Sequence, residues 1–164
     1  MLRPLWLALC ALLLLIGPAA ALQLQTGTVT WVYDGDTLQV EPIGKVRLLG
    51  IDTPESKDSQ RDNYYRSRYQ LSRKRLRQIA RQAKEFNIEQ TKGKPVQLQF
   101  DGDKTDKYQR KLAYLYLPNG HMLNRILLEK GLASVFRRYD FTYKDDFISL
   151  EQAARTKRLG LWRP

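Results

Sequence analysis

Hydrophobic and polar residues alternate with a period of two along the first third of the chain, which is typical of β-strands. The alternation covers residues 25–40, with Val29 and Trp31 predicted on one face. It is interrupted at Asp34-Gly35-Asp36, and Asp-Gly is a strong hairpin-turn signal. Residues 45–51 predict a third strand. The same period predicts two later strands, at residues 96–100 and 112–117.

Apolar residues at helical spacing predict three α-helices. The longest covers residues 64–88 and has many arginines and lysines on its polar face, where solvated side chains are the simplest interpretation. A short helix covers residues 122–130 and ends at Gly131. A last helix covers residues 144–158, and the polar residues 56–63 predict a loop.

The predicted order is three strands, one helix, two strands and two helices. This order fits an α+β fold built on a five-stranded Greek-key barrel of the OB-fold type with three α-helices, an architecture whose face and loops bind oligonucleotides. Residues 22–164 contain no repeat and no linker, so they predict one domain.

Residues 1–21 have the pattern of a secretory signal peptide. Arg3 provides the positive start, residues 5–16 are apolar, and Ala19-Ala20-Ala21 is a small-residue cleavage site. The alternatives are an uncleaved anchor, for which the apolar run is short compared with the ~20 residues of a membrane span, and lipid attachment at Cys10. We expect a secreted or periplasmic protein with no transmembrane segment in its mature chain.

The net charge of the chain limits the kinds of molecule that the protein is expected to bind. The chain has a formal net charge of +11, which falls to +10 when the signal peptide and its Arg3 are removed. Such a basic domain is expected to bind a polyanion: nucleic acid, an anionic membrane surface or an acidic polysaccharide. Nothing in the sequence implies a stable protein partner, and we expect a monomer.

Residue types exclude several kinds of chemistry. Cys10 is the only cysteine and leaves with the signal peptide, so the mature chain has no disulfide, thiolate nucleophile or cysteine–zinc site. His121 is the only histidine, and it follows the turn sequence Pro118-Asn119-Gly120, where an exposed position is expected. A serine triad would have to use this one histidine.

Two acidic clusters flank the third strand, at residues 34–37 and 52–55. Oxygen ligands without histidine or cysteine select a hard cation, Ca²⁺ or Mg²⁺. Asp36 and Asp52 end neighbouring strand segments and can meet at one ion, to which Thr53 can add its backbone carbonyl.

The residues around these clusters suit phosphodiester hydrolysis. Glu55 lies three residues beyond Asp52 and can accept a proton from an attacking water. Arg47 and Arg110 can each hold phosphate oxygens with a planar two-point fork. Each of these features is weak alone, but together and in this order they indicate a metal-assisted nuclease.

Five stretches carry a resemblance along nearly all of the mature chain: VYDGDTLQV, VRLLGIDTPE, TDKYQRKLAYLY, LNRILLEKGLASV and KRLGLW. They resemble the staphylococcal nuclease (thermonuclease) family. The resemblance implies an OB-fold, one Ca²⁺, and cleavage of DNA and RNA with little sugar specificity to products ending in 3′-phosphate.

The resemblance also implies roles for individual residues. Asp36, Asp52 and the Thr53 carbonyl match calcium ligands, and Glu55 matches a glutamate near the attacking water. Further matches are the phosphate-binding Arg47 and Arg110, and the terminal-phosphate contacts Lys107 and Tyr108.

One departure from the family pattern lies at residues 136–139, Phe-Arg-Arg-Tyr. Tyr139 keeps one position of a tyrosine pair that flanks the base pocket, and Arg137 replaces the other. Base stacking is therefore expected to differ, with Arg137 adding a phosphate or cation–π contact.

Two other functions stay open at this point. The first is a nucleic-acid-binding module without catalysis, which would not need Asp36, Arg47, Asp52, Glu55 and Arg110 together. The second is an adhesion or envelope protein that binds anionic polymers, which explains the charge and the signal peptide but not the carboxylates.

The signal-peptide pattern predicts that the mature protein starts near Leu22 and is found outside the cytoplasm. N-terminal sequencing of exported protein tests this directly. Exported protein that still begins at Met1 would contradict it.

Overall fold

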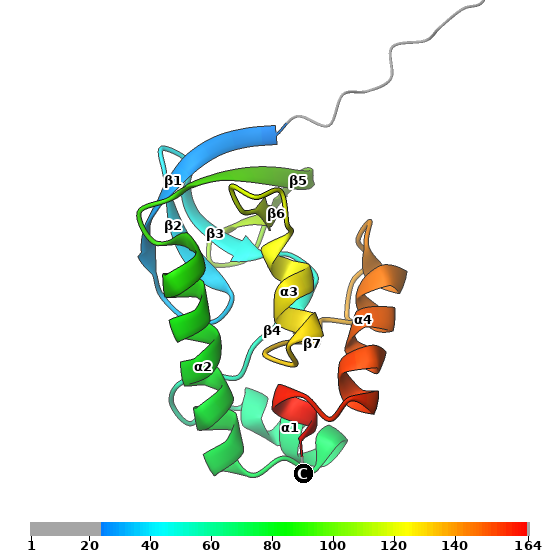
Figure 1. The fold of residues 1–164 in the computed structure, drawn as a ribbon. Coiled ribbons are helices and arrows are strands. Elements are labelled where there is room, and N and C mark those ends of the chain that lie inside the picture. The colour runs from blue at the N-terminus through cyan, green and yellow to red at the C-terminus, as the bar shows by residue number, and fades with distance from the viewer. Residues whose placement is uncertain (1–23, 164) are drawn as a thin grey trace, which may run out of the picture.

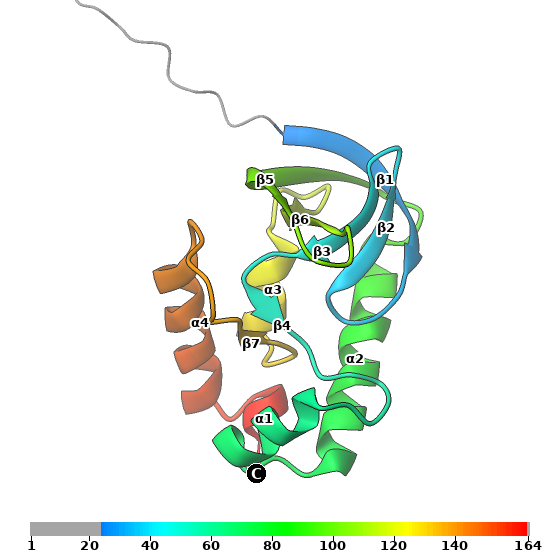
Figure 2. The same ribbon diagram turned by 180° about the vertical axis from the view of Figure 1, so that it is seen from behind.

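Residues 24–163 are described by the structure, which is a computed structural model, and the predicted signal peptide lies outside these residues. Five strands close into a barrel in the order β1-β2-β3-β6-β5, and helices lie beyond one end of it (Figures 1 and 2). The elements are β1 (Leu24–Val32), β2 (Thr37–Glu41), β3 (Gly44–Leu48), β4 (Ile51–Asp52), α1 (Arg61–Tyr69), α2 (Arg73–Thr91), β5 (Pro95–Thr105), β6 (Lys111–Tyr116), α3 (Leu123–Glu129), β7 (Ser134–Val135), α4 (Lys144–Thr156) and the 3₁₀-helix η1 (Gly160–Trp162).

The barrel confirms the predicted OB-fold and the mixed α+β class. Pairing is antiparallel except between β3 and β6, which run parallel and join the two halves of the sheet. Val29 of β1 pairs with Val40 of β2, and both side chains are buried in the core. A register shift between Val29 and Trp31 reverses which side chains of β1 point into the barrel. Val32 is therefore buried and Trp31 is exposed. The alternation alone placed Trp31 on the wrong face.

The predicted third strand over residues 45–51 is two strands in the structure. β3 ends at Leu48, and β4 pairs with β7 in a separate two-stranded sheet. Gly50 makes the break: its φ of 80° lies in the left-handed region, which glycine adopts without a steric cost. After this turn β4 leaves the barrel sheet, yet Asp52 stays within 3.1 Å of Arg47 on β3.

The prediction of a single helix over residues 64–88 is also wrong in one respect. The structure has two helices there, α1 and α2. Gln70 adopts a left-handed conformation with φ 56°, which ends α1. Ser72 then caps α2, its hydroxyl accepting a hydrogen bond from the backbone N–H of Arg75 at 3.2 Å. The described residues therefore contain four α-helices where three were predicted.

Helix α2 joins the barrel to the far end of the molecule (Figure 1). Its buried face includes Leu76, Ile79 and Ala83. Near its C-terminal end the buried Asn87 donates from Nδ2 to the carbonyl oxygen of Gly35 at 2.8 Å. This bond ties the helix to the β1–β2 turn. No helix within residues 24–163 is long and apolar enough to cross a membrane.

A glycine test checks the role of the β3–β4 break. An alanine Cβ at Gly50 would lie 2.6 Å from the Phe141 ring, whereas one at Gly93, with a similar φ of 76°, would have no atom within 4 Å. Both substitutions add backbone strain, but only the first adds a clash. We expect Gly50→Ala to lower the free energy of unfolding by about 1–3 kcal/mol more than Gly93→Ala. Equal losses in denaturant titrations would contradict this.

Candidate active site

The turn between β1 and β2 positions the first acidic residue of the site. Asp34 Oδ1 accepts a hydrogen bond from the backbone N–H of Asp36 at 3.0 Å, an Asx turn. A Cβ at Gly35 would lie 2.7 Å from the Thr53 hydroxyl oxygen, so only glycine fits at this close approach. The Asp-Gly-Asp sequence therefore forms the predicted turn and brings Asp36 against Thr53.

Asp36 is almost fully buried and uses both carboxylate oxygens. Oδ1 accepts from Arg47 Nη1 at 2.5 Å and from the Thr37 hydroxyl at 3.0 Å. Oδ2 accepts from the backbone N–H of Thr53 at 3.2 Å. Two of the predicted site residues, Arg47 and Thr53, therefore donate hydrogen bonds to the carboxylate of a third, Asp36.

Arg47 bridges the two acidic clusters. Its Nη2 lies 3.1 Å from Asp52 Oδ1, while its Nη1 contacts Asp36. Burial acts against a charged guanidinium, but the carboxylates of Asp36, Asp52 and Asp34 outweigh it and raise the pKa of Arg47. The arginine therefore stays charged and partly neutralises carboxylates that would otherwise repel each other.

Helix α1 supplies two contacts to Asp52 that the sequence analysis missed. Arg61 Nε lies 2.7 Å from Asp52 Oδ2, and the Tyr65 hydroxyl donates to the same oxygen at 2.8 Å. Burial and then the charge of Asp52 raise the pKa of Tyr65, so its hydroxyl stays protonated as a donor. The sequence analysis left Arg61 in a predicted loop and gave Tyr65, which is fully buried, no role at the site. Arg61 and Tyr65 are four residues apart, about one helical turn, so a helix would place them on the same face. That spacing was the signal from which the two contacts to Asp52 could have been predicted.

Glu55 lies beside these groups, with a side chain that reaches solvent and is partly covered by its neighbours. Partial burial, and then repulsion from the carboxylates of Asp34, Asp36 and Asp52, raise the pKa of Glu55. The pKa of Asp34 is also raised, first by burial and then by Asp36. Burial is thus the larger cause of both shifts, and the neighbouring carboxylates add to it more than Arg47 removes.

Arg77 on α2 fixes the loop that carries Glu55. Its guanidinium donates to the backbone carbonyl of Glu55 and pairs with Asp58 at 3.2 Å and with the buried Asp62. The sequence placed Arg77 on a solvated helix face. It is instead a structural residue of the site, because its ion pairs hold the segment after β4 against α2.

Arg110 reaches the site through Thr37. Its Nη1 donates to the Thr37 hydroxyl at 3.0 Å, and that hydroxyl donates in turn to Asp36. Asp106 holds Arg110 from the other side, with Oδ2 2.6 Å from Nη2. Arg47 and Arg110 therefore approach the same carboxylate from β3 and from the start of β6.

The predicted substrate-binding residues fall into two groups. Tyr108 and Tyr139 are about two-thirds exposed, at 66% and 65%. Lys107 Nζ lies 4.9 Å from the centre of the Tyr108 ring. Arg137 pairs instead with the buried Glu151 and donates to the Val135 carbonyl at 3.3 Å. A substrate contact by any of these four stays a prediction.

The donor set fits a hard divalent cation. No group of three or more histidine, cysteine, aspartate and glutamate side chains within the described part of the chain is placed to hold a metal by itself. A cation here would take oxygens from Asp36 and Asp52, the Thr53 carbonyl and water, all ligands that Ca²⁺ accepts. Arg47 contacts both carboxylates, so it would have to give up some of these contacts.

Comparison with known proteins assigns the family. A family model described as staphylococcal nuclease homologue matches residues 45–164. The chain belongs to the staphylococcal nuclease family. The match contains Arg47, Asp52, Glu55 and Arg110, and the structure adds Asp36 from the preceding turn through its bond to Arg47.

Named relatives extend the match to the strands before residue 45. The chain is 40% identical over 150 residues to an uncharacterized protein of Methanocaldococcus jannaschii, covering 83% of this chain and 70% of that protein. It is 35% identical over 141 residues to endonuclease YncB of Bacillus subtilis, covering 82% and 60%. It is 28% identical over 142 residues to a thermonuclease of Staphylococcus hyicus, covering 84% and 76%. The chain thus spans 60% to 76% of the length of these family members.

The role of Arg77 predicts a stability effect. Arg77→Ala leaves the buried carboxylate of Asp62 without its cation, which we expect to cost about 3 kcal/mol of unfolding free energy. The control is Arg73→Ala, one turn earlier on the exposed face of α2, which should change stability by less than about 0.5 kcal/mol. Equal losses for the two variants in urea titrations would show that the Arg77–Asp62 pair is not structural.

Proposed function

We propose that this chain is a secreted, calcium-dependent nuclease that hydrolyses phosphodiester bonds in DNA and RNA. It acts with little sugar specificity and releases products that end in 3′-phosphate. One observation supports this most strongly: Arg47 and Arg110 approach the buried Asp36, directly and through Thr37, beside a second carboxylate at Asp52. The family assignment and the names of the relatives support the same reaction.

The electrostatics of the proposed reaction follow from this arrangement. A phosphodiester gains negative charge on its non-bridging oxygens when water attacks, and preorganised donors stabilise that charge. Arg47 and Arg110 are suited to bind these oxygens because each guanidinium is already held by a carboxylate. Ca²⁺, held by Asp36, Asp52 and the Thr53 carbonyl, would supply further charge neutralisation at the phosphate and orient a water molecule.

Glu55 is the proposed proton acceptor. A carboxylate with a raised pKa is a better base than an ordinary surface glutamate. The bond from Arg77 to the Glu55 backbone holds the loop and leaves the carboxylate to accept a proton from the water. Tyr139 is proposed to stack on a base, and Lys107 and Tyr108 are proposed to contact a terminal phosphate.

The proposed function is tested by incubating the purified mature protein with single-stranded DNA, double-stranded DNA and RNA. Cleavage of all three in Ca²⁺ and none in excess chelator is the expected result. Undiminished cleavage in chelator would rule out the calcium requirement. Tight binding without cleavage under every condition would favour the non-catalytic binding module instead.

Substitution of Arg110 separates chemistry from binding. Its contacts should strengthen as charge develops, so Arg110→Ala should lower turnover at least about 10²-fold while changing nucleotide affinity much less. Arg110→Lys should not restore turnover, because an ammonium lacks the planar fork. Arg73→Ala is the control, with turnover unchanged. A folded Arg110→Ala protein with near-native turnover would remove Arg110 from the reaction.

Glu55→Gln tests the proposed base. The amide cannot accept a proton, so turnover should fall by a factor on the order of 10²–10⁴. Gln keeps the size of the side chain, and circular dichroism of the variant checks that the fold is intact. Turnover within a few-fold of the native protein would assign the proton acceptor elsewhere.

A further inference from the structure

A second basic surface lies at the end of the molecule away from the barrel, where α1, the start of α2 and the C-terminal segment meet (Figures 1 and 2). These elements line an open cavity of about 720 Å³. We call it the basic cavity, and the residues that define it are Arg68, Lys74, Arg75, Arg155, Arg163 and Trp162. No acidic residue lines it.

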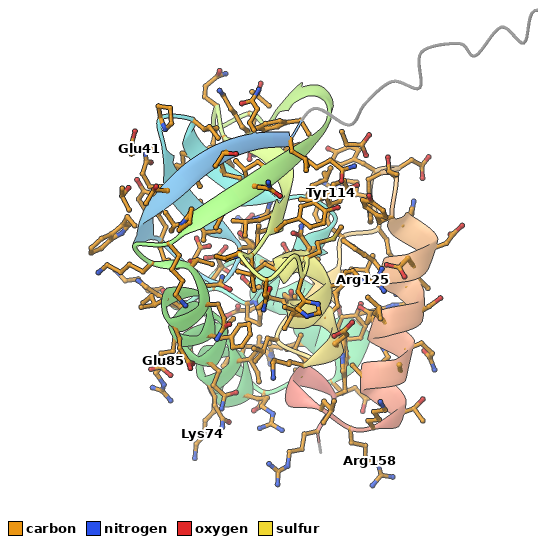
Figure 3. All side chains as sticks on the ribbon, turned by 45° about the horizontal axis from the view of Figure 1, so that its top comes forward. Glu41, Lys74, Glu85, Tyr114, Arg125 and Arg158 are labelled. Carbon is orange, nitrogen blue, oxygen red and sulfur yellow. The ribbon has the colours of Figure 1, made fainter. Side chains whose placement is uncertain are left out.

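The surrounding sequence makes this end strongly positive. Residues 61–81 contain eight arginines and lysines and one acid, Asp62, and residues 152–164 contain four basic residues and no acid. Lys74 extends outward from this end in Figure 3, as does Arg158. Within the described part of the chain, Arg68, Lys74, Arg75 and Arg163 form no ion pair. Their charges are therefore available to an anionic ligand.

The start of α2 adds to this positive potential. Arg73, Lys74 and Arg75 occupy the first turn of a 19-residue helix that has no acidic residue there. The helix dipole places partial positive charge at the same point, so these cations destabilise the helix end unless an anion is present. An anion bound in the basic cavity would remove this repulsion.

Among the residues that line the basic cavity, two have a buried donor atom without a partner in the described part of the chain: Arg155 Nε and Trp162 Nε1. The Arg155 guanidinium lies 4.2 Å from the centre of the Trp162 ring, and the Tyr69 ring packs edge-on against Trp162 at 5.0 Å. The basic cavity therefore combines cations with aromatic rings, the combination that binds single-stranded nucleic acid.

We infer that the basic cavity binds backbone phosphates of single-stranded nucleic acid at a second site, outside the Asp36–Asp52 centre. The choice of nucleic acid over another polyanion rests on the proposed function. Helix α1 connects the two places: Arg61 contacts Asp52, and Arg68 lies seven residues further along. At 1.5 Å per residue this separation is roughly 10 Å, or about three nucleotides at 3.4 Å per step. One strand can therefore occupy both sites.

The test measures binding without cleavage. A fluorescent 20-nucleotide single strand is titrated with protein in excess chelator, at several salt concentrations. Arg68→Ala/Lys74→Ala should bind about five- to ten-fold more weakly at low salt. The slope of log affinity against log salt should fall in magnitude by about 1.4, because each lost phosphate contact on a single strand contributes about 0.7. Both side chains are exposed, so the double variant should stay folded, which its unfolding temperature checks.

The matched control is Lys92→Ala/Lys94→Ala, which removes the same charge at the opposite end of α2. It should retain native affinity and slope. Equal behaviour of the two double variants would overturn the inference. The inference would also be overturned if Arg68→Ala/Lys74→Ala lost affinity for vesicles of anionic lipid but kept native affinity for the single strand. That result would assign the basic cavity to a membrane surface. Binding is measured in chelator and does not require cleavage. The binding result can therefore be interpreted even if the nuclease assay shows no cleavage.

Discussion

The ion bridge from Arg47 to Asp36 and Asp52 is the interaction on which the site depends. Two largely buried carboxylates repel each other, and burial of either without a cation is costly. The pairing of Thr37 with Arg47 in the β2–β3 hairpin places the guanidinium beside Asp36. The break at Gly50 then brings Asp52 back to the other nitrogen of the same group.

The bridge does not remove the repulsion among the carboxylates around it. Burial is the first cause of the raised pKa values of Asp34 and Glu55, and the neighbouring carboxylates raise them further. A folded site with unneutralised carboxylates is less stable than one with balanced charge, and it attracts a divalent cation for the same reason. Arg47 thus has two roles. It pairs with Asp36 and Asp52 in the free protein, and it binds phosphate in the proposed reaction.

The sequence predicted the barrel, and it singled out Asp36, Arg47, Asp52 and Thr53, which the structure brings together, because both depend on local patterns. Alternation and turn chemistry located the strands, and the acidic residues lie at the strand ends. The errors have local physical causes. The helix breaks at Gln70, where neither glycine nor proline signals a break. The bulge after Val29 shifts the strand by one residue, which an alternating pattern of hydrophobic residues does not reveal. Arg61 and Arg77 were missed because their partners depend on how α1 and α2 pack against the loop after β4.

Calcium affinity of an Arg47→Gln variant tests the central claim most directly. If Arg47 and the metal share Asp36 and Asp52, loss of the guanidinium charge removes a competitor, and Ca²⁺ should bind about ten-fold more tightly by calorimetry, the change expected from one like charge nearby. Nucleotide affinity of the same folded variant should fall. Calcium binding that is unchanged or weaker in Arg47→Gln would contradict the account, because Arg47 would then not occupy the carboxylates that the cation needs.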